Sequence, residues 1–450
     1  MNNFIKVLRF SLIVVPLFFV GHLQAYGSTD DMQETYKNLE IFSNILSIVQ
    51  QNYVDDVDPQ ETLEGAIKGM LTSLDPHSSF LKPDDFKELQ VETKGSFSGI
   101  GIEISTKDDV LTVVSPIEGT PAFAAGIEAG DTIIKIEGVS TKDMSLIEAV
   151  KKLRGPKGTE VTISVYREGW GELKDFTIVR DVIPIYSVRS SVLEPGYGYI
   201  RITNFQRNTA KDLQKNLEDL LGEGTLKGLV LDLRNNPGGL LDSSVKVVDL
   251  FLDEGIIVST KGRLKDQNLE FSAHRGGPEY NFTIVILINS GTASASEIVA
   301  GALQDHKRAF ILGTQSFGKG SVQTIIPMSD GAGLRLTTAR YYTPNGTSIQ
   351  ATGITPDVLV PKTATSKDED SEGQIEFFRE KDLRHHLENG GNLKPVDEKP
   401  LPPTIEESNL ISAGVTVDEN SNEKLKDDYQ LKTALLVLKS LNIRAEARPD

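Results

Sequence analysis

Two residues in the second half of the chain could together carry out nucleophilic chemistry. Ser294 lies in the stretch GTASASEIVAGALQD, and Lys319 follows 25 residues later in SFGKGS. A serine hydroxyl becomes a nucleophile when a base removes its proton, and a neutral lysine can be that base. The pKa of the lysine would have to fall from about 10.4 to about 7 to 8, which burial can impose. The pair would then support acyl transfer.

The sequence around Lys319 suits a lysine with a lowered pKa. Gly318 and Gly320 allow a tight turn, and no acidic residue lies between Asp305 and Asp330. Gln323, four residues after the lysine, could orient it by hydrogen bonding without adding charge. The ordinary alternative is a solvated surface lysine, because lysines are rarely buried.

Ser294 is expected at the start of a helix. The β-branched apolar run Thr283–Ile288 predicts a buried strand, a polar turn follows it, and the helix begins near Ser294. A serine in this position is ordinarily an N-cap. The alternative is a nucleophile at the positive end of the helix dipole, where free backbone amides can hold an oxyanion. Ser296 is the neighbouring competitor for the role of nucleophile.

The chain offers few histidines for a serine–histidine arrangement. His306 follows Ser294 by 12 residues along the expected helix, which places it roughly 18 Å away at ~1.5 Å per residue. Of the others, only His274, in a polar loop, is a serious rival to Lys319. The remaining histidines lie in the N-terminal segment, in a turn or in the tail: His22, His77, His385 and His386.

Composition bounds the class of protein. A chain of 450 residues with 38% hydrophobic content has room for two or three domains. Its net charge of −17 argues against nucleic-acid binding, which needs a basic surface. The absence of cysteine excludes disulfides and thiol chemistry.

Residues 1–25 have the order of charge and hydrophobicity of a secretory signal. Lys6 and Arg9 precede an apolar core, and the segment ends at Ala25. Leu23 makes the cleavage site imperfect, so an uncleaved N-terminal anchor stays an alternative. The expected location is the bacterial periplasm, with attachment to the inner membrane if the segment is retained.

Four regions follow the signal. Residues 26–94 are expected to be helical, with helices at Asp30–Asn52 and Pro59–Leu74, then the turn SLDPHSSFL; this region is expected to mediate dimerisation. Residues 95–181 show short strands, glycine turns and two helical pieces. Residues 182–362 alternate strands and helices, which predicts an α/β fold with a mixed, mostly parallel sheet closed by a hairpin.

Residues 363–450 form a tail of different character. They hold 19 Asp and Glu against 12 Lys and Arg. Most of the tail to Glu423 is interpreted as an acidic linker, with a helix expected at Gln374–Leu387. A second helix is predicted at Lys424–Asn442, and its leucine face needs a partner, either the rest of the chain or a second copy.

The motifs SGIGIEI, PAFAAGIEAGDTIIKIEG and LRGPKGT in residues 95–181 resemble a PDZ domain. The resemblance implies that a peptide adds as an extra strand beside a helix, with its carboxylate held by backbone amides. The implied carboxylate turn is Phe97, Ser98, Gly99 and Ile100, and the implied groove helix contains Ile147 and Val150. The resemblance also matches Arg154 with a sensor of bound peptide, although an arginine at the surface without a role is the alternative.

The serine helix GTASASEIVAGALQD, the FGKGSVQ and DLRNNPGG segments and the preceding PDZ-like domain together resemble the C-terminal processing peptidases. This family implies a crotonase-like core with a Ser-Lys dyad: Ser294 as nucleophile, Lys319 as general base and Gln323 as its orienting partner. The amide of Ala295, with that of Gly238 or Gly239, would form the oxyanion hole. No cofactor or metal is implied.

The same resemblance implies polypeptide substrates, namely the C-terminal tails of exported proteins with an apolar last residue. A homo-oligomer and an activating adaptor protein are further expectations. The alternatives are a catalytically inactive PDZ-bearing scaffold or assembly factor and a crotonase-type acyl-thioester enzyme, which the PDZ-like insertion and the export signal disfavour. A trypsin-like PDZ protease is disfavoured by the missing serine motif.

Overall fold

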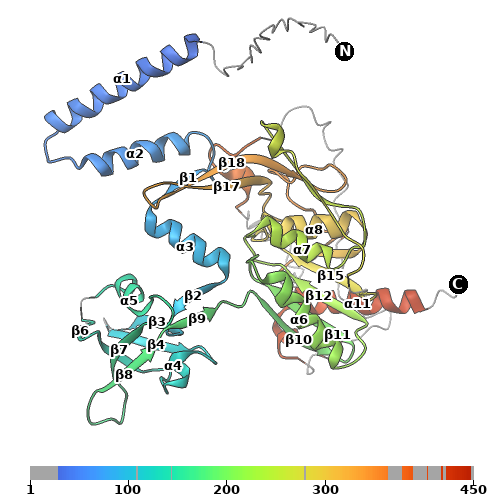
Figure 1. The fold of residues 1–450 in the computed structure, drawn as a ribbon. Helices are drawn as coiled ribbons and strands as arrows, with labels where there is room; N and C mark the ends of the chain where they lie inside the picture. Colours follow the sequence, from blue (N-terminus) through green and yellow to red (C-terminus); the bar gives the residue numbers. More distant parts are fainter. Residues whose placement is uncertain are drawn as a thin grey trace, which may run out of the picture. The chain divides into compact units, whose positions relative to one another are not determined.

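The computed structural model describes residues 29–107, 110–142, 144–277, 280–362, 378–388, 403, 417–418 and 422–446 (Figure 1). The expected signal segment lies outside these residues. The chain divides into two units, Met1–Ile67 and Lys68–Asp450. In the part of the chain that the structure describes, no helix combines the length and the apolar character needed to cross a membrane.

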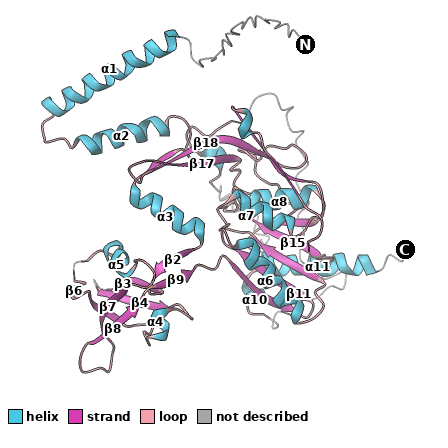
Figure 2. Cartoon of the chain, viewed as in Figure 1, coloured by secondary structure: helices cyan, strands magenta, loops and turns pink. Residues whose placement is uncertain are grey.

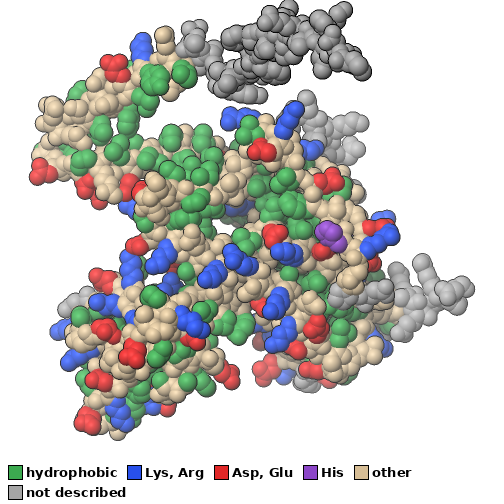
Figure 3. Space-filling model, in the orientation of Figure 1, with side chains coloured by type: hydrophobic (Ala, Val, Ile, Leu, Met, Phe, Trp, Pro, Cys, Tyr) green, Lys and Arg blue, Asp and Glu red, His purple; other side chains and the backbone are tan. Residues whose placement is uncertain are grey.

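The first unit consists of helix α1 (Thr29–Asn52) and the beginning of helix α2 (Pro59–Thr72). The helices predicted for this region are therefore confirmed. Figure 3 shows hydrophobic side chains on the surface of this unit. The apolar side chains that α1 exposes recur at helical spacing: Met32, Tyr36, Leu39, Phe42, Ile45 and Ile48. Dimerisation through this region stays a prediction.

The segment between α2 and the PDZ-like domain is more structured than predicted. It holds a short strand, β1 (Ser79–Leu81), and helix α3 (Pro83–Lys94). A proline and two aspartates begin the helix, and Gly95 ends it in the left-handed conformation at φ 74°. Phe86 is its one buried residue, so the apolar periodicity was too weak to give the bounds of this helix.

The predicted PDZ-like domain has a curved sheet and two short helices (Figure 2). The helices are α4 (Pro121–Ala124) and α5 (Leu146–Leu153). The strands are β2 (Ser96–Gly99), β3 (Ile102–Lys107), β4 (Val110–Pro116), β5 (Thr132–Ile136), β6 (Val139–Ser140), β7 (Glu160–Tyr166), β8 (Lys174–Val179) and β9 (Asp181–Pro184). The sheet runs in the order β3-β4-β5-β7-β8, with β6 beside β5, while β2 and β9 pair with each other. Strand β3 is thus an edge strand.

The main sheet confirms the predicted α/β core. Its order is β10-β11-β12-β15-β16-β19, and every pair except β10 with β11 is parallel. The strands are β10 (Val188–Glu194), β11 (Tyr197–Ile202), β12 (Gly228–Asp232), β15 (Thr283–Ile288), β16 (Ala309–Gly313) and β19 (Val358–Leu359). Strands buried on both faces are continuously apolar, and here alternate residues of β12 and β15 enter two different cores.

Helices cover both faces of this sheet. The first core joins Leu229, Leu231 and Ile286 to helices α6 (Thr209–Gly222), α7 (Leu241–Asp249) and α8 (Ala295–Asp305). The second core joins Val230, Val285 and Leu287 to the C-terminal helices α10 (Lys424–Asp427) and α11 (Tyr429–Glu446). The predicted C-terminal helix is therefore interrupted at Asp428, and its leucine face packs against the chain's own sheet.

A second, antiparallel sheet lies in the same unit. Its path is β1-β18-β13-β14, and β17 also pairs with β18. The new strands are β13 (Ile256–Gly262), β14 (Glu270–Ser272), β17 (Ser321–Pro327) and β18 (Gly333–Tyr342), with a 3-10 turn η1 (Lys265–Gln267) between β13 and β14. The pairing of β17 with β18 confirms the predicted hairpin.

The helix expected at Gln374–Leu387 is wrong where the structure describes it. Residues 374–377 lie outside the described part, and residues 378–388 contain a single 3-10 turn, η2 (Glu380–Asp382). The Glu380 side chain is fully buried. This part of the tail is therefore docked on the protein and is not a solvated linker.

Candidate active site

Ser294 sits in a strained turn between strand β15 and helix α8. It has a φ of 55° and a ψ of −116°, a conformation that costs free energy for a residue with a side chain. The residue occupies the N-cap position, but its hydroxyl makes no capping hydrogen bond. The strain therefore does not serve helix capping, and it leaves the hydroxyl available for chemistry.

The competing hydroxyl of Ser296 is committed to structure. It is fully buried, and its Oγ donates to the carbonyl oxygen of Asn236 at 3.0 Å. The amide of Ala293 donates to the same carbonyl, also at 3.0 Å. Ser296 thus fastens the serine turn to the Asn235–Gly239 turn and has no free hydroxyl to offer.

Glu297 links the serine turn to the lysine loop, and it was not singled out from the sequence. Its carboxylate is fully buried and accepts four hydrogen bonds. Oε1 accepts from the Ser316 hydroxyl at 2.5 Å and from the Gly318 amide at 2.7 Å. Oε2 accepts from the amides of Ser294 at 2.8 Å and of Lys319 at 2.9 Å. One oxygen atom therefore holds the backbone of both reactive residues.

The protonation of Glu297 reflects two opposed effects. Burial raises its pKa to about 7, and the four donated hydrogen bonds act against that rise because they favour the carboxylate. All four donors are directed at the carboxylate oxygens, an arrangement that suits the ionised form.

The ammonium group of Lys319 lies in a largely buried setting that favours its neutral form. Burial lowers the pKa of Lys319 below its usual range, and the positive charge of Arg335 acts in the same direction. Three carboxylates oppose this: those of Glu380, Glu297 and Asp75. The local sequence suggested a lysine without acidic neighbours, and this is wrong because the fold brings carboxylates from three distant segments.

Glycines fix the path of the lysine loop. Gly318 has a φ of 96°, which favours glycine. A Cβ at Gly320 would lie 2.2 Å from the amide nitrogen of Gln350, so only a glycine fits this close contact. The amide of Gly320 also donates to Oε1 of Gln350 at 3.0 Å. The loop is therefore tightly held on both sides of Lys319.

Gln323 lies on β17, close to the lysine loop in sequence but bonded elsewhere. Its Nε2 donates to the Ser321 hydroxyl at 2.9 Å and to the Thr337 hydroxyl at 3.4 Å. Among the described residues, no hydrogen bond joins the Lys319 ammonium to Ser294 or to Gln323. The structure therefore holds the backbones of Ser294 and Lys319 together without joining their reactive atoms.

The Asn235–Gly239 turn packs directly against Ser294. A Cβ added to Gly238 would lie 2.8 Å from the Cβ of Ser294. The Gly238 amide donates to Oδ1 of Asn236 at 2.9 Å, so it is already engaged. The amides of Gly239 and Ala295 have no hydrogen-bond acceptor within the described part of the chain. These two are the amides that could receive an oxyanion.

The C-terminal helix anchors this turn through Arg234. The guanidinium of Arg234 donates to both carboxylate oxygens of Asp428, at 2.9 and 2.6 Å, and to Gln430 at 3.0 Å. It also pairs with Asp232 at the end of β12. Arg234 directly precedes the turn, so residues far along the tail fix its position.

Neither His306 nor His274 is placed to act as a base for Ser294. His306 caps α8 and its Nε2 contacts the carbonyl oxygen of Ile256 at 2.7 Å. His274 is exposed and pairs with Asp249.

His77, by contrast, lies near the lysine loop, because its Nε2 contacts the buried carboxylate of Glu380 at 2.8 Å. No local pattern predicted this contact, because it joins residues 303 positions apart.

The expected peptide groove differs in detail from the prediction. Phe97, Ser98 and Gly99 lie in strand β2, paired with β9, so they are not a turn as predicted; only Ile100 and Gly101 separate this strand from β3. Ile147 on α5 is exposed and Val150 is half-buried. The strand was missed because its partner β9 lies some 80 residues further along the chain.

Arg154 contacts the region of the expected carboxylate site. Its guanidinium carbon lies 4.9 Å from the centre of the Phe97 ring, a cation–π arrangement. The next residue, Gly155, donates its amide to the carbonyl oxygen of Ser98 at 3.2 Å. The end of the groove helix is thus joined to strand β2.

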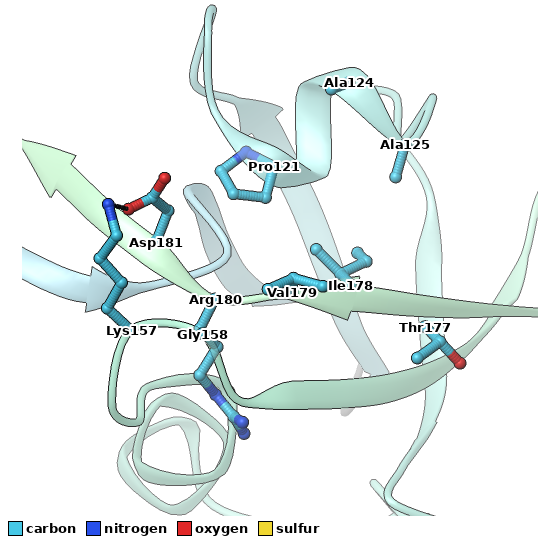
Figure 4. A pocket seen from close by; sticks show the side chains of 10 residues that line it. All are labelled: Pro121, Ala124, Ala125, Lys157, Gly158, Thr177, Ile178, Val179, Arg180 and Asp181. Atoms are coloured by element: carbon cyan, nitrogen blue, oxygen red, sulfur yellow. Dashed lines mark ion pairs between the residues drawn. The ribbon is translucent and has the colours of Figure 1, made fainter.

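A cavity of about 500 Å³ lies elsewhere in the PDZ-like domain (Figure 4). It is bordered by helix α4 and the end of strand β8, and the ion pair of Lys157 with Asp181 stands at one side of it. None of the expected groove residues lines it. In the part of the chain that is described, no cluster of three His, Cys, Asp or Glu side chains is suited to a metal ion.

Family models match most of the described chain. Residues 196–360 match the model of peptidase family S41, residues 88–166 match the PDZ domain, and residues 21–84 match the N-terminal domain of the activating protease CtpB. The predicted PDZ domain is thereby confirmed.

Curated relatives carry consistent names. The chain is 48% identical to the carboxy-terminal-processing protease of Bartonella bacilliformis over 363 residues, covering 80% of this chain and 83% of the relative. It is 36% identical to the carboxyl-terminal-processing protease of Synechocystis, covering 80% and 88%. Among solved structures, the photosystem II D1 C-terminal processing protease is 32% identical with a TM-score of 0.41, covering 72% of this chain and 92% of that one.

Replacing Glu297 should uncouple the serine from the lysine loop. Glu297→Gln keeps the size of the side chain but places an NH2 group where an oxygen accepts two donors. Leaving a buried donor without an acceptor costs about 1 to 3 kcal/mol. The rate constant for labelling Ser294 with a fluorophosphonate probe should fall by at least about tenfold. The matched control Glu223→Gln, at an exposed site, should label like the wild type. Equal rates in the two variants, with thermal unfolding showing both folded, would rule out the linking role.

Replacing Lys319 with an apolar residue should stabilise the protein. A lowered pKa means that the folded chain binds this proton less tightly than the unfolded chain, so protonated Lys319 opposes folding below its folded-state pKa. That penalty fades as the pH rises toward the usual lysine value of 10.5. Lys319→Met should therefore have a larger free energy of unfolding than the wild type at pH 7, with the difference shrinking at alkaline pH. Urea denaturation at several pH values measures this, and the exposed Lys265→Met serves as control; a less stable Lys319→Met at pH 7 contradicts the prediction.

Proposed function

Because this chain belongs to the carboxy-terminal-processing proteases of peptidase family S41, we propose that it cleaves polypeptides with a Ser294–Lys319 dyad. Its membership confirms the resemblance inferred from the sequence, and with it the assignment as a serine-type protease that carries a PDZ domain. The observation that carries the dyad is the shared acceptor: Oε2 of Glu297 binds the amides of both residues. Their two amide nitrogens can therefore be no farther apart than these two hydrogen bonds together.

The mechanism begins with proton transfer between these two residues. Neutral Lys319 takes the proton of the Ser294 hydroxyl, and the oxygen attacks the carbonyl carbon of the scissile peptide bond. The carbonyl oxygen becomes an oxyanion, held by the amides of Ala295 and Gly239. Each such donor typically contributes about 3 to 4 kcal/mol to lowering the barrier.

Collapse of the tetrahedral intermediate completes the first half of the reaction. The C–N bond breaks, the leaving amine takes the proton from the Lys319 ammonium, and an ester on Ser294 remains. Neutral Lys319 then removes a proton from water, which attacks the ester, and the reverse transfer releases the acid and restores Ser294. Lys319 can therefore accept or donate the proton in every step of this reaction, and no other acid or base is needed.

Gly239 is preferred over Gly238 as the second oxyanion donor. The Gly238 amide is occupied by the side chain of Asn236, whereas the Gly239 amide has no acceptor in the described part of the chain. Ala295 is the first residue of α8, where amides lack partners within the helix. Its amide also benefits from the positive end of the helix dipole.

Gln323 suits the orienting role through its carbonyl oxygen. Both recorded hydrogen bonds of its side chain are donated by Nε2, to Ser321 and to Thr337. They fix the amide group and leave Oε1 without a donor among the described residues. An approaching Lys319 ammonium could therefore donate to it. This would hold the lysine near Ser294 during the proton transfers.

The PDZ domain supports a role in recognising C-terminal tails. Strand β3 pairs with β4 on one side and, among the described residues, has no partner strand on the other, so an extended peptide could add there with α5 alongside. The substrates proposed are exported proteins with an apolar C-terminal residue, met in the bacterial periplasm. The signal-like residues 1–25 support that location, and an uncleaved segment would attach the protein to the inner membrane. A homo-oligomer through the N-terminal helices and an activating adaptor belong to the same proposal.

One assay on protein lacking residues 1–25 tests the dyad. An unfolded polypeptide with an apolar C-terminus should be cleaved by the wild type and by Ser296→Ala, while Ser294→Ala and Lys319→Ala should each lose at least about a thousandfold in kcat/KM. Activity retained in either of the last two variants would exclude the dyad. Lack of cleavage by the wild type, with peptide binding intact, would favour the inactive scaffold.

The contact of Arg154 with the Phe97 ring suggests that Arg154 senses a bound peptide, and this can be tested. A peptide with an apolar C-terminal residue should stimulate cleavage of a second substrate by the wild type. Arg154→Ala should reduce that stimulation several-fold, while leaving unstimulated cleavage unchanged, because the contact joins the groove helix to β2. The same peptide with an amidated C-terminus is the control. Undiminished stimulation in Arg154→Ala would remove the sensor role.

A further inference from the structure

One buried carboxylate close to the lysine loop has no part in the mechanism described above. Glu380 comes from the tail segment 378–388, and its side chain is fully buried. Burying a carboxylate costs several kcal/mol unless charges and hydrogen bonds compensate it. If Glu380 only docked the tail on the protein, an apolar side chain could do so without the free-energy cost of burying a charge. The partners of Glu380 indicate what it does.

We propose that His77, Glu380 and Gln350 form a largely buried relay that positions the loop carrying Lys319. We call these three residues the lysine brace. The proposal rests on the proposed function, because positioning matters only if Lys319 is the base. It assigns His77 and the tail segment 378–388 to the working parts of the enzyme as positioning elements.

The lysine brace forms hydrogen bonds with the loop on both sides of Lys319. On the near side, the amide of Glu380 donates to the carbonyl oxygen of Phe317 at 3.1 Å. On the far side, the amide of Gly320 donates to Oε1 of Gln350 at 3.0 Å, and Nε2 of Gln350 donates to Oε1 of Glu380 at 2.9 Å. A single tail residue therefore controls both ends of the Phe317–Gly320 segment.

His77 completes the relay from the other end of the chain. Its Nε2 lies 2.9 and 2.8 Å from the two carboxylate oxygens of Glu380, and an ionised carboxylate only accepts, so Nε2 carries the hydrogen. The turn that holds His77 is itself rigid. Asp75 accepts the amides of His77 and Ser78 at 2.7 and 2.8 Å, and the Thr337 hydroxyl donates to Asp75 at 3.1 Å.

The brace also reaches the strand beside Gln323. Arg335 of β18 donates through Nε to the carbonyl oxygen of His77 at 3.1 Å. Thr337 of the same strand receives a hydrogen bond from Gln323. The turn of His77, strand β18 and the tail thus form one polar network around Lys319. Such networks act cooperatively and lose their value when one member is removed.

The charges facing Lys319 give the brace a measurable signature. They are Arg335 on β18, Glu380 in the tail, Glu297 on α8 and Asp75 in the turn, with His77 paired to Glu380. The carboxylate of Glu380 favours the protonated lysine. Removing its charge while keeping its shape should therefore lower the pKa of Lys319 further. A residue with a purely structural role would not shift the pH profile.

Kinetics of full-length variants at several pH values test the brace. Glu380→Ala and His77→Ala should reduce kcat about tenfold or more with KM little changed, because they misplace the base and not the substrate. Glu380→Gln should retain more activity than Glu380→Ala and should move the rising limb of the kcat–pH profile to lower pH. The control Glu388→Gln, an exposed residue of the same segment, should match the wild type in both respects.

The outcomes separate the brace from the dyad. If the wild type cleaves and depends on Ser294 and Lys319, but folded Glu380→Ala and His77→Ala keep the wild-type kcat, the brace is wrong and the dyad stands. If activity does not depend on Lys319, the proposed function fails first. Should an alanine variant not fold, Glu380→Gln decides the matter: an unchanged kcat and pH profile would overturn the brace.

Discussion

The arrangement of the site depends on one oxygen atom. Oε2 of Glu297 accepts the amides of Ser294 and Lys319, which come from two loops 25 residues apart. The strained backbone of Ser294 persists only because its surroundings over-determine it, and this hydrogen bond is one of the constraints. Because Oε1 accepts hydrogen bonds from Ser316 and Gly318, the whole lysine loop is held in place by the first turn of α8.

This solution creates an electrostatic conflict that the structure must resolve. Lys319 must be neutral to act as the proposed base, yet it lies near the carboxylates of Glu297, Glu380 and Asp75, all of which favour its ammonium form. Each of these carboxylates is engaged by other donors: Glu297 by four, Asp75 by backbone amides and hydroxyls, Glu380 by His77 and Gln350. Hydrogen bonds donated to a carboxylate favour its charged form, so they stabilise these groups in the buried site. Burial and the positive Arg335 then decide the direction in which the lysine pKa moves.

Much of this molecule could be predicted from local patterns. The apolar strand Thr283–Ile288, the helix after Ser294 and the β17–β18 hairpin each have a periodicity that a short window reveals. The two loops that carry Ser294 and Lys319 were likewise identified from their own residues. Helix α3 lies in the region predicted to be helical, but its bounds were not predicted because it buries only one side chain. Phe97–Gly99 were expected in a turn because strand β2 is defined by a partner far along the chain. Glu297, His77 and Glu380 could not be found locally either, since their importance lies in contacts with residues distant in sequence.

The tail illustrates why composition alone misleads about function. Its excess of acidic residues up to Glu423 indicated an acidic linker, yet Glu380 within that segment, and Asp428 in the helix predicted after it, hold opposite halves of the site. Asp428 pairs with Arg234 and fixes the turn of Gly238 and Gly239, while Glu380 grips the lysine loop. The helix that follows Asp428 covers one face of the central sheet, so the turn of Gly238 and Gly239 and the core are stabilised by the same part of the chain. A charged side chain that is buried needs an oppositely charged or hydrogen-bonding partner, because its desolvation costs free energy. Such pairs suit positions where a reacting group has to be held precisely. The candidate site is therefore assembled from segments far apart in the second unit, and the loops with the recognisable motifs are positioned by residues outside them.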